Sequence, residues 1–188
     1  VKGACEFLFV GRVMKEKGIE EFLYCAERYH SADVRFGIVG YCEEEYEGRL
    51  KELSGRGVIE FYGFSTDMKE YYKNAGVIVV PSYHEGISNV LLEASSSGRP
   101  VIASDISGCR EAVDDKVTGI LSRPRDRENL ADAVQRMIDK TPQERREMGI
   151  NARKKMEREF DRRIVVDRYM NEIENAGGRI YWIFMRTT

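Results

Sequence analysis

The sequence predicts an α/β fold built on a doubly wound parallel sheet of about six strands. Short, β-branched apolar segments alternate along the chain with longer segments whose apolar residues recur every three or four positions. This alternation is typical of strands joined by right-handed crossover helices, which produce a parallel sheet. Glycines and polar residues follow several strand-like segments, as expected where a ligand site forms at the carboxyl edge of such a sheet. We therefore expect helices on both faces of the sheet.

Composition narrows the class of protein. The chain has 188 residues, of which 42% are hydrophobic and 33% charged, values that fit one globular domain. A net charge of -2 argues against a nucleic-acid partner, so any phosphate site must be local. No apolar run is long enough to span a bilayer. The cysteines show no metal-like pairing, and their apolar settings suggest the reduced thiols of a cytoplasmic protein: Cys5, Cys25, Cys42 and Cys109.

The individual elements follow from local patterns. Runs rich in β-branched and aromatic residues, bounded by glycine or polar residues, predict strands at 6–10, 34–40, 58–61, 77–80, 99–103 and 119–121. Apolar residues at helical spacing predict helices at 19–29, 43–54, 68–75, 89–97, 127–139, 142–159 and 161–174, and a helical turn at 109–113. Thr141, Pro142 and Glu144 form a capping box with a proline at the first helical position, which predicts where the longest of these helices begins.

The two ends of the chain are expected to differ from the domain between them. Gly177 and Gly178 predict a hinge, so the domain should cover residues 1–175 and a tail should cover 176–188. The apolar stretch 180–185 fits docking on another domain, on a membrane surface or on a second copy, and also fits a frameshift artefact. The chain begins abruptly at Val1, close to the first strand, which suggests a piece of a longer protein.

The stretch after the strand at 77–80 is the main candidate site. Gly86 allows the backbone to approach a ligand closely. The amides of Ile87, Ser88 and Asn89 should be unpaired donors at the start of the next helix, and such donors attract phosphate. This turn is therefore a candidate phosphate-binding element.

Two carboxylates flank this turn, Glu85 in the loop and Glu93 in the helix. Carboxylates accept hydrogen bonds and can take bidentate pairs of them, so they suit sugar and ribose hydroxyls. With Glu85 outside the helix, both side chains can face one cavity. Their spacing alone leaves open that both are solvated surface acids.

A basic loop joins the first strand to the first helix. Gly11 ends the strand, and Arg12 and Lys17 flank the junction. Arg12 as a planar fork and Lys17 as a point charge suit a diphosphate. The alternative is a solvated basic loop, and Lys15 is expected to face solvent.

These motifs together resemble the second, nucleotide-sugar-binding domain of the retaining family 4 glycosyltransferases, which have the GT-B fold. The resemblance covers the chain from Cys5 to about Glu174. It rests on several ordered motifs: Gly11-Arg12, Lys15-Glu16-Lys17-Gly18, Glu85-x7-Glu93 with Gly86 and Ser88-Asn89 between, Gly108-Cys-Arg-Glu111, and the segment 114–121. It implies a Rossmann-like domain that forms the C-terminal half of a GT-B architecture.

The resemblance also implies roles for single residues. Arg12 and Lys17 would stabilise the leaving diphosphate, Glu85 would hold hydroxyls of the transferred sugar, and these three are the implied catalytic residues. Glu93 would hold the ribose hydroxyls. Phe64 would lie beside the nucleobase, although it also fits plain core. The implied substrate-binding positions are Gly11, Gly40, Gly63, Phe64, Gly86, Ile87, Ser88, Asn89 and Glu93.

The implied substrate is a nucleotide-diphosphate sugar. No metal or other cofactor is expected, because cations and helix amides can meet the charge of the leaving group. The acceptor site would belong to an N-terminal GT-B domain, so this chain alone should transfer little sugar. The motif at 108–111 resembles family members that build capsule, O-antigen or other lipid-linked glycans, whose acceptors lie at the inner face of the bacterial cell membrane.

The same residues also bear on the alternative functions. A non-catalytic nucleotide-sugar-binding module and a sugar-nucleotide epimerase of the same architecture remain open. A two-carboxylate glycosidase is disfavoured, because Glu85 and Glu93 lie on one loop–helix unit. A nicotinamide enzyme is disfavoured because no GxGxxG follows the first strand.

Overall fold

The computed structural model describes the backbone of residues 5–185 and the side chains of residues 5–164 and 166–175. Expectations about residues 1–4 and 186–188, including the start at Val1, lie outside the described residues. The strands are β1 (Cys5–Val10), β2 (Val34–Val39), β3 (Glu60–Gly63), β4 (Val77–Val80), β5 (Val101–Ser104) and β6 (Gly119–Ser122). The helices are α1 (Ile19–Tyr29), α2 (Glu44–Gly55), α3 (Lys69–Asn74), α4 (Asn89–Ser96), α5 (Ser107–Ala112), α6 (Arg127–Asp139), α7 (Pro142–Glu159) and α8 (Arg162–Met185), and a short 3-10 helix, η1, covers Lys15–Lys17.

The strands form one parallel sheet in the order β3-β2-β1-β4-β5-β6. This confirms the predicted doubly wound sheet of about six strands. The chain runs outward from β1 through β2 to β3, then returns to the other side of β1 with β4. The strand order thus reverses between β1 and β4, and sheets of this kind bind ligands outside the carboxyl ends of the strands at such a point.

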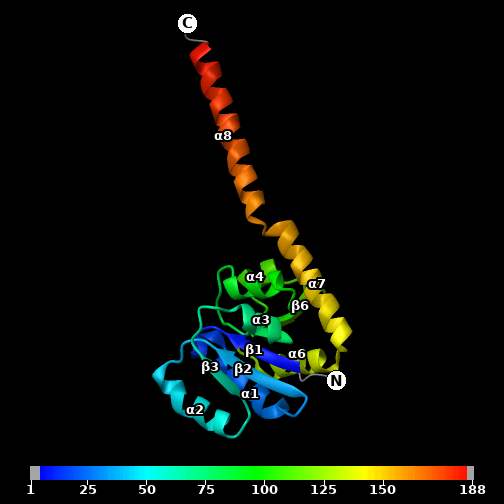
Figure 1. Ribbon diagram of the computed structural model, residues 1–188. Coiled ribbons are helices and arrows are strands. Elements are labelled where there is room, and N and C mark those ends of the chain that lie inside the picture. The colour runs from blue at the N-terminus through cyan, green and yellow to red at the C-terminus, as the bar shows by residue number, and fades with distance from the viewer. Residues whose placement is uncertain (1–4, 186–188) are drawn as a thin grey trace.

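The core consists of two apolar layers, one on each face of the sheet. Figure 1 shows the helices that cover the sheet. Successive residues of a strand point to opposite faces. Phe7 and Phe9 of β1 therefore pack with α1, α2 and α6, whereas Leu8 packs with α3, α4 and α5. The rings of Phe7 and Phe36 stack with centroids 5.3 Å apart. Burial on both faces explains why the central strands are apolar throughout.

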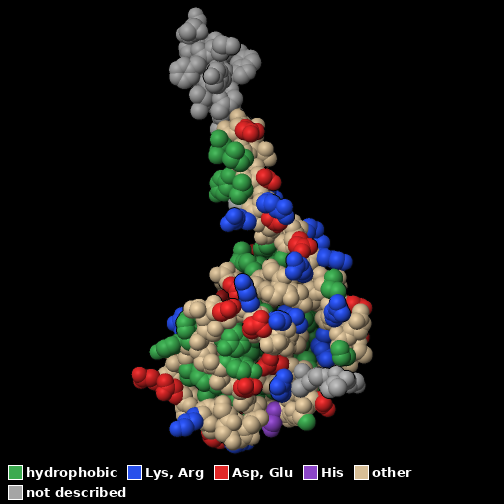
Figure 2. Space-filling view, in the orientation of Figure 1, with side chains coloured by type: hydrophobic (Ala, Val, Ile, Leu, Met, Phe, Trp, Pro, Cys, Tyr) green, Lys and Arg blue, Asp and Glu red, His purple; other side chains and the backbone are tan. Residues whose placement is uncertain are grey.

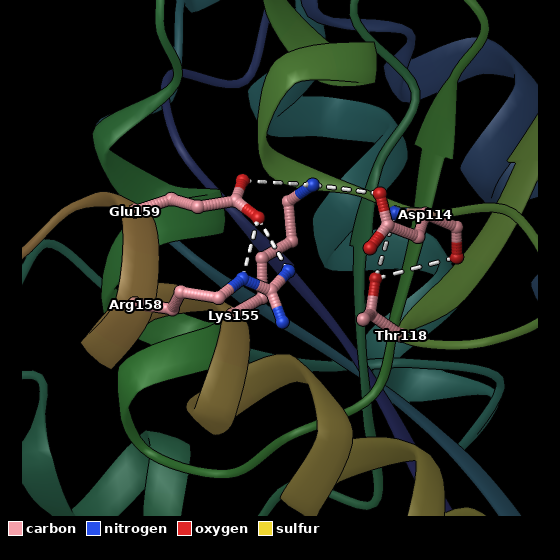
Figure 3. Close-up of polar contacts among 5 residues, drawn as sticks. All are labelled: Asp114, Thr118, Lys155, Arg158 and Glu159. Atoms are coloured by element: carbon pink, nitrogen blue, oxygen red, sulfur yellow. Dashed lines mark hydrogen bonds and ion pairs between the residues drawn. The ribbon is translucent and has the colours of Figure 1, made fainter.

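A buried lysine holds α7 against the domain (Figure 3). The side chain of Lys155 is 8% exposed, and its Nζ lies 2.6 Å from Asp114 Oδ1 and 3.2 Å from Glu159 Oε2. The backbone amide of Asp114 donates to the hydroxyl of Thr118 at 2.8 Å. We call Lys155, Asp114 and Glu159 the α7 clasp. Because α7 packs on α4, the clasp supports the helix that begins at the candidate site.

The predicted start of α7 is confirmed. The Thr141 hydroxyl accepts from the Glu144 amide, and the Glu144 carboxylate accepts from the Thr141 amide. Pro142 occupies the first turn, where its missing amide hydrogen costs nothing.

The last helix differs from the prediction. Instead of ending near residue 174, α8 runs without a break to Met185, so the predicted hinge at Gly177 and Gly178 is wrong. Each glycine costs a helix only about 1 kcal/mol relative to alanine, which the flanking helical segments can offset. In Figure 1, α8 projects away from the domain. No helix within residues 5–185 combines the length and the apolar character needed to cross a membrane.

One side of α8 is apolar and exposed (Figure 2). Val166, Tyr169, Met170 and Ile173 recur at helical spacing and are each more than half exposed. The domain itself leaves this stripe uncovered.

Two shorter elements also differ from their predictions. β3 begins at Glu60 instead of residue 58, because Val58 and Ile59 are buried in the core before the chain reaches the edge of the sheet. α5 begins at Ser107 instead of residue 109, and Gly108 is buried within it. The sequence pattern indicates which residues are buried. In both places the first buried residues do not mark the start of the strand or helix.

Candidate functional site

Two loops meet at the point where the strand order reverses. We call residues 11–18, which follow β1, the basic loop, and residues 81–88, which follow β4, the acidic loop. The backbone amide of Tyr83 donates to the carbonyl of Glu16 at 2.8 Å, which ties the two loops together. Both loops lie at the carboxyl edge of the sheet, where the fold predicts a ligand site.

An ion pair joins the two loops. Lys17 Nζ lies 2.6 Å from Glu85 Oε1, with the lysine side chain 30% exposed and the glutamate 17% exposed. The hydroxyl of buried Ser82 donates to the same Glu85 oxygen at 2.8 Å. Two of the predicted catalytic residues, 68 positions apart in sequence, therefore contact each other directly.

Arg12 and Glu93 line a neighbouring pocket of about 370 Å³. Three further residues of its wall are predicted substrate-binding positions, Gly11, Gly40 and Phe64. A cation and a carboxylate in one open pocket suit a ligand that carries both phosphate and hydroxyl groups. Phe64 is 71% exposed, which excludes the alternative that it belongs to the core.

Tyr72 sets the position of Glu93. Its hydroxyl donates to Glu93 Oε2 at 2.8 Å, and its ring is buried. Burial, together with this hydrogen bond, raises the pKa of Tyr72, so the phenol remains a donor at neutral pH. A carboxylate has two acceptor oxygens, so Glu93 can accept from a ligand hydroxyl while it keeps its bond to Tyr72.

The floor of the site is main chain. A Cβ at Gly40 would lie 1.8 Å from the carbonyl oxygen of Gly11. A Cβ at Gly108 would lie 1.6 Å from the carbonyl oxygen of Gly86. No side chain fits at either place, so glycine at 40 and 108 brings neighbouring loops into direct backbone contact.

The helix that follows the acidic loop, α4, begins at Asn89, as predicted. Ser88 is its N-cap and Asn89 its first residue, so the first-turn amides start at Asn89 and those of Ile87 and Ser88 precede the helix. The Ser88 side chain makes no capping bond to these amides. Backbone amides at the start of a helix can donate to a phosphate group, so the predicted phosphate site stays a prediction.

The structure places the four predicted charged side chains in two groups: Lys17 contacts Glu85, whereas Arg12 and Glu93 line one pocket. The basic loop supplies Arg12 and Lys17, while Glu85 comes from the acidic loop and Glu93 from α4. The pocket that holds Arg12 and Glu93 is not lined by Lys17 or Glu85. Instead of the expected single crevice, the structure has an ion pair and a separate pocket that share only the basic loop.

Sequence reasoning did not identify Ser82 and Tyr72, which hold the two carboxylates. Ser82 lies three residues before Glu85, so its closeness in sequence could have indicated that its hydroxyl contacts Glu85. Tyr72 lies on α3, and only the fold shows that it reaches Glu93. Within the described part of the chain, no group of three or more His, Cys, Asp or Glu side chains is arranged to hold a metal ion.

Burial keeps the thiol beside the ion pair in its neutral form. Cys109 is fully buried in α5, and its pKa is raised to about 12, chiefly by burial and further by the charge of Glu85, against a lowering by Lys17. All four cysteines are unpaired. Cys25 and Cys109 are buried, and Cys5 and Cys42 are partly buried.

Fold and site together define a class of protein: a doubly wound α/β domain with paired basic and acidic loops at the reversal of strand order. Residues 4–140 match the model of the protein family described as "Glycosyl transferases group 1". The chain belongs to this family.

Two curated relatives show how much of a whole protein this chain represents. An uncharacterized glycosyltransferase of Methanocaldococcus jannaschii is 32% identical over 136 residues, which cover 70% of this chain and 35% of the relative. The N,N'-diacetylbacillosaminyl-diphospho-undecaprenol alpha-1,3-N-acetylgalactosaminyltransferase of Campylobacter jejuni is 25% identical over 166 residues, covering 87% of this chain and 43% of the relative. The chain therefore spans less than half the length of either.

Two solved structures have the same fold. Sucrose-phosphate synthase from Thermosynechococcus elongatus superposes with a TM-score of 0.81 at 28% identity, covering 95% of this chain and 47% of that chain. The C-terminal domain of a group 1 family glycosyl transferase from Francisella tularensis superposes with a TM-score of 0.71 at 25% identity. The second match covers 84% of this chain and 87% of that domain.

Proposed function

We propose that this chain is the donor-binding, C-terminal domain of a retaining family 4 glycosyltransferase, which transfers a sugar from a nucleotide-diphosphate sugar to a glycan or lipid-linked acceptor. The observation that carries the proposal is the 2.6 Å contact between Lys17 and Glu85 where the strand order reverses. Coverage of nearly the whole of a solved C-terminal domain supports the assignment to the C-terminal half.

The charge that develops on the leaving diphosphate is met by the basic loop. Arg12 offers a planar fork of donors and Lys17 a mobile ammonium. The first-turn amides of α4, from Asn89 onward, add further donors. Such fixed charges act where negative charge grows in the transition state, and the proposal needs no metal ion for this step.

The two carboxylates hold hydroxyl groups. Glu85 accepts from hydroxyls of the transferred sugar, and Glu93 accepts from the ribose. Glu85 Oε1 accepts hydrogen bonds from Lys17 and Ser82. Donor binding then exchanges partners: Lys17 turns to the diphosphate and Glu85 to the sugar. Partial exposure of both side chains makes this exchange inexpensive.

The acceptor and the facing wall of the cleft come from an N-terminal GT-B domain. We propose a lipid-linked acceptor, with the enzyme in the cytoplasm and peripheral to the membrane, in bacterial surface polysaccharide synthesis. The name of the Campylobacter jejuni relative, which includes a diphospho-undecaprenol acceptor, supports this class of acceptor.

Isothermal titration calorimetry tests donor binding directly. The purified chain should release or absorb heat with at least one of UDP, GDP and ADP at millimolar concentration. The same titration with Lys15→Met should match wild type, because Lys15 is exposed and contacts neither carboxylate. Absence of heat with all three nucleotides would contradict the proposal.

Turnover assays separate this function from its alternatives. The isolated chain should transfer little sugar, and activity should appear when an N-terminal GT-B domain is supplied. Nucleotide released only in the presence of an acceptor indicates transfer, whereas an altered donor without acceptor indicates epimerisation. Binding without turnover after that domain is restored would favour a non-catalytic module.

A further inference from the structure

Arg125 adopts a backbone conformation that a side chain makes unfavourable. It lies in the turn between β6 and α6 with φ of 59°, in the left-handed region. Glycine would occupy this region without a Cβ clash. A non-glycine residue held there points to a role for its side chain, because surrounding structure must maintain the strain.

The Arg125 side chain reaches the acidic loop. Its guanidinium carbon lies 4.8 Å from the centroid of the Tyr83 ring, a cation–π geometry. One of its terminal nitrogens lies 3.5 Å from Nε2 of His84. A turn more than 40 positions away in sequence thus covers the two residues that precede Glu85.

Tyr83 is held from the other side by α1. Its hydroxyl donates to Glu21 Oε1 at 2.8 Å. Glu21 is only 9% exposed, and its second oxygen, Oε2, is buried without a hydrogen-bond partner in the described part of the chain. Because a buried carboxylate needs its partners, the Tyr83 hydroxyl cannot be withdrawn cheaply.

We propose that Arg125, Tyr83 and Glu21 form a clamp that fixes the acidic loop, and that Arg125 is a positioning residue for Glu85. Tyr83 lies two residues before Glu85, so a ring fixed on one face by Arg125 and at its hydroxyl by Glu21 limits where Glu85 can move. The clamp also sets the loop when Glu85 releases Lys17 to bind a sugar. This second part rests on the proposed function, whereas the clamp itself does not.

Arg125→Gly tests the clamp in the ligand-free protein. This change removes the guanidinium and relieves the backbone, so thermal stability should stay the same or rise. Hydrogen exchange of the amides at 82–88 should nevertheless become at least fivefold faster. Lys116→Gly is the matched control, because Lys116 is the other non-glycine residue with positive φ among the described residues, at 65°. It should leave exchange at 82–88 unchanged.

Ligand titration then tests positioning. Arg125→Gly should weaken binding of a nucleotide-diphosphate sugar at least fivefold and binding of the bare nucleoside diphosphate less than twofold, because only the sugar depends on Glu85. Arg125→Asn, which tolerates the left-handed region but lacks the guanidinium, should behave in the same way. Tyr83→Phe should loosen the loop less, since it keeps the ring and loses only the bond to Glu21.

Two results would overturn the clamp: unchanged exchange at 82–88 in both Arg125 variants, or equal acceleration in Lys116→Gly. Equal weakening of both ligands would overturn the positioning role. If wild type binds no nucleotide sugar while the exchange result holds, the clamp stands and the proposed function fails.

Discussion

Two lysine–carboxylate contacts of the same length have different settings in this molecule. Lys17 meets Glu85 at 2.6 Å at the open edge of the sheet, and Lys155 meets Asp114 at 2.6 Å beneath α7. Lys17 has one carboxylate partner and is 30% exposed. Lys155 has a second carboxylate, Glu159, and is 8% exposed.

The difference shows that distance alone does not reveal what an ion pair does. A partly exposed pair contributes about 0–1 kcal/mol to stability, so its partners are free to exchange. A buried lysine with two acceptors cannot leave them without losing charged hydrogen bonds. The site pair is therefore suited to ligand exchange and the α7 clasp to holding a helix in place.

The largest change in stability should come from disturbing the main-chain floor of the candidate site, where Gly108 lies against Gly86. Gly108→Ala places a Cβ 1.6 Å from the Gly86 carbonyl, so the acidic loop must move. We expect a loss of about 3 kcal/mol in unfolding free energy, measured by urea denaturation. Gly48→Ala is the control, because its Cβ would meet open space within α2 and should stabilise the helix by about 0.5–1 kcal/mol. Wild-type stability in Gly108→Ala would contradict the described floor.

Removing the α7 clasp should cost less. Lys155→Met keeps the buried aliphatic stem and loses both charged contacts, so we expect a loss of about 2 kcal/mol in unfolding free energy. Affinity for nucleoside diphosphates should change less than twofold. Lys154→Met, at the exposed neighbouring position on α7, should change stability by less than about 0.5 kcal/mol. Equal stability of the two variants would show that the clasp does not hold α7.

Replacing Lys17 should have the opposite effect to replacing Lys155: a small change in stability and a large change in affinity. Lys17→Met should change the unfolding free energy by no more than about 1 kcal/mol, because the pair is partly exposed. Affinity for the bound nucleoside diphosphate should fall about tenfold, which corresponds to about 1.4 kcal/mol. Urea denaturation measures the unfolding free energy and isothermal titration calorimetry the affinity, each beside the Lys15→Met control. A large loss of stability with unchanged affinity would make Lys17 a second structural clasp.

Alkaline pH should give the smallest effect, a loss of about 1 kcal/mol in unfolding free energy from ionisation of the Cys109 thiol. The pKa of Cys109 is raised by burial from an ordinary value of 9.0 to about 12. The neutral thiol therefore contributes its full stabilisation below pH 9 and loses it as the pH rises toward 12. The difference in unfolding free energy between wild type and Cys109→Ala should narrow by about 1 kcal/mol between pH 8 and pH 10. A constant difference would show that the thiol is not protected.

Local patterns predicted much of the fold. The bounds of α1, α6 and β4 coincide with the predicted ones, because apolar spacing and capping are read within a single segment. Boundaries that depend on a neighbour were less accurate. β3 pairs with β2 through a register irregularity between Ile38 and Val39, which no pattern within either segment encodes.

The candidate site was predicted in its residues more than in its arrangement. Lys17 and Glu85 stood out as a cation and an acid at two strand ends, but their direct contact depends on how two loops fold against each other. Gly108 appeared as one letter of a motif, and only the structure shows that it lies against Gly86. Arg125 gave no signal, since a left-handed arginine has no signature in sequence.

The backbone contacts of Gly40 with Gly11 and of Gly108 with Gly86 limit how this surface can be redesigned. Main-chain atoms are the same whatever the residue, and neither glycine position accepts a Cβ. Directed evolution will therefore find few useful changes in the floor and should randomise the exposed rim instead, beginning with Tyr41, Phe64 and Ile87.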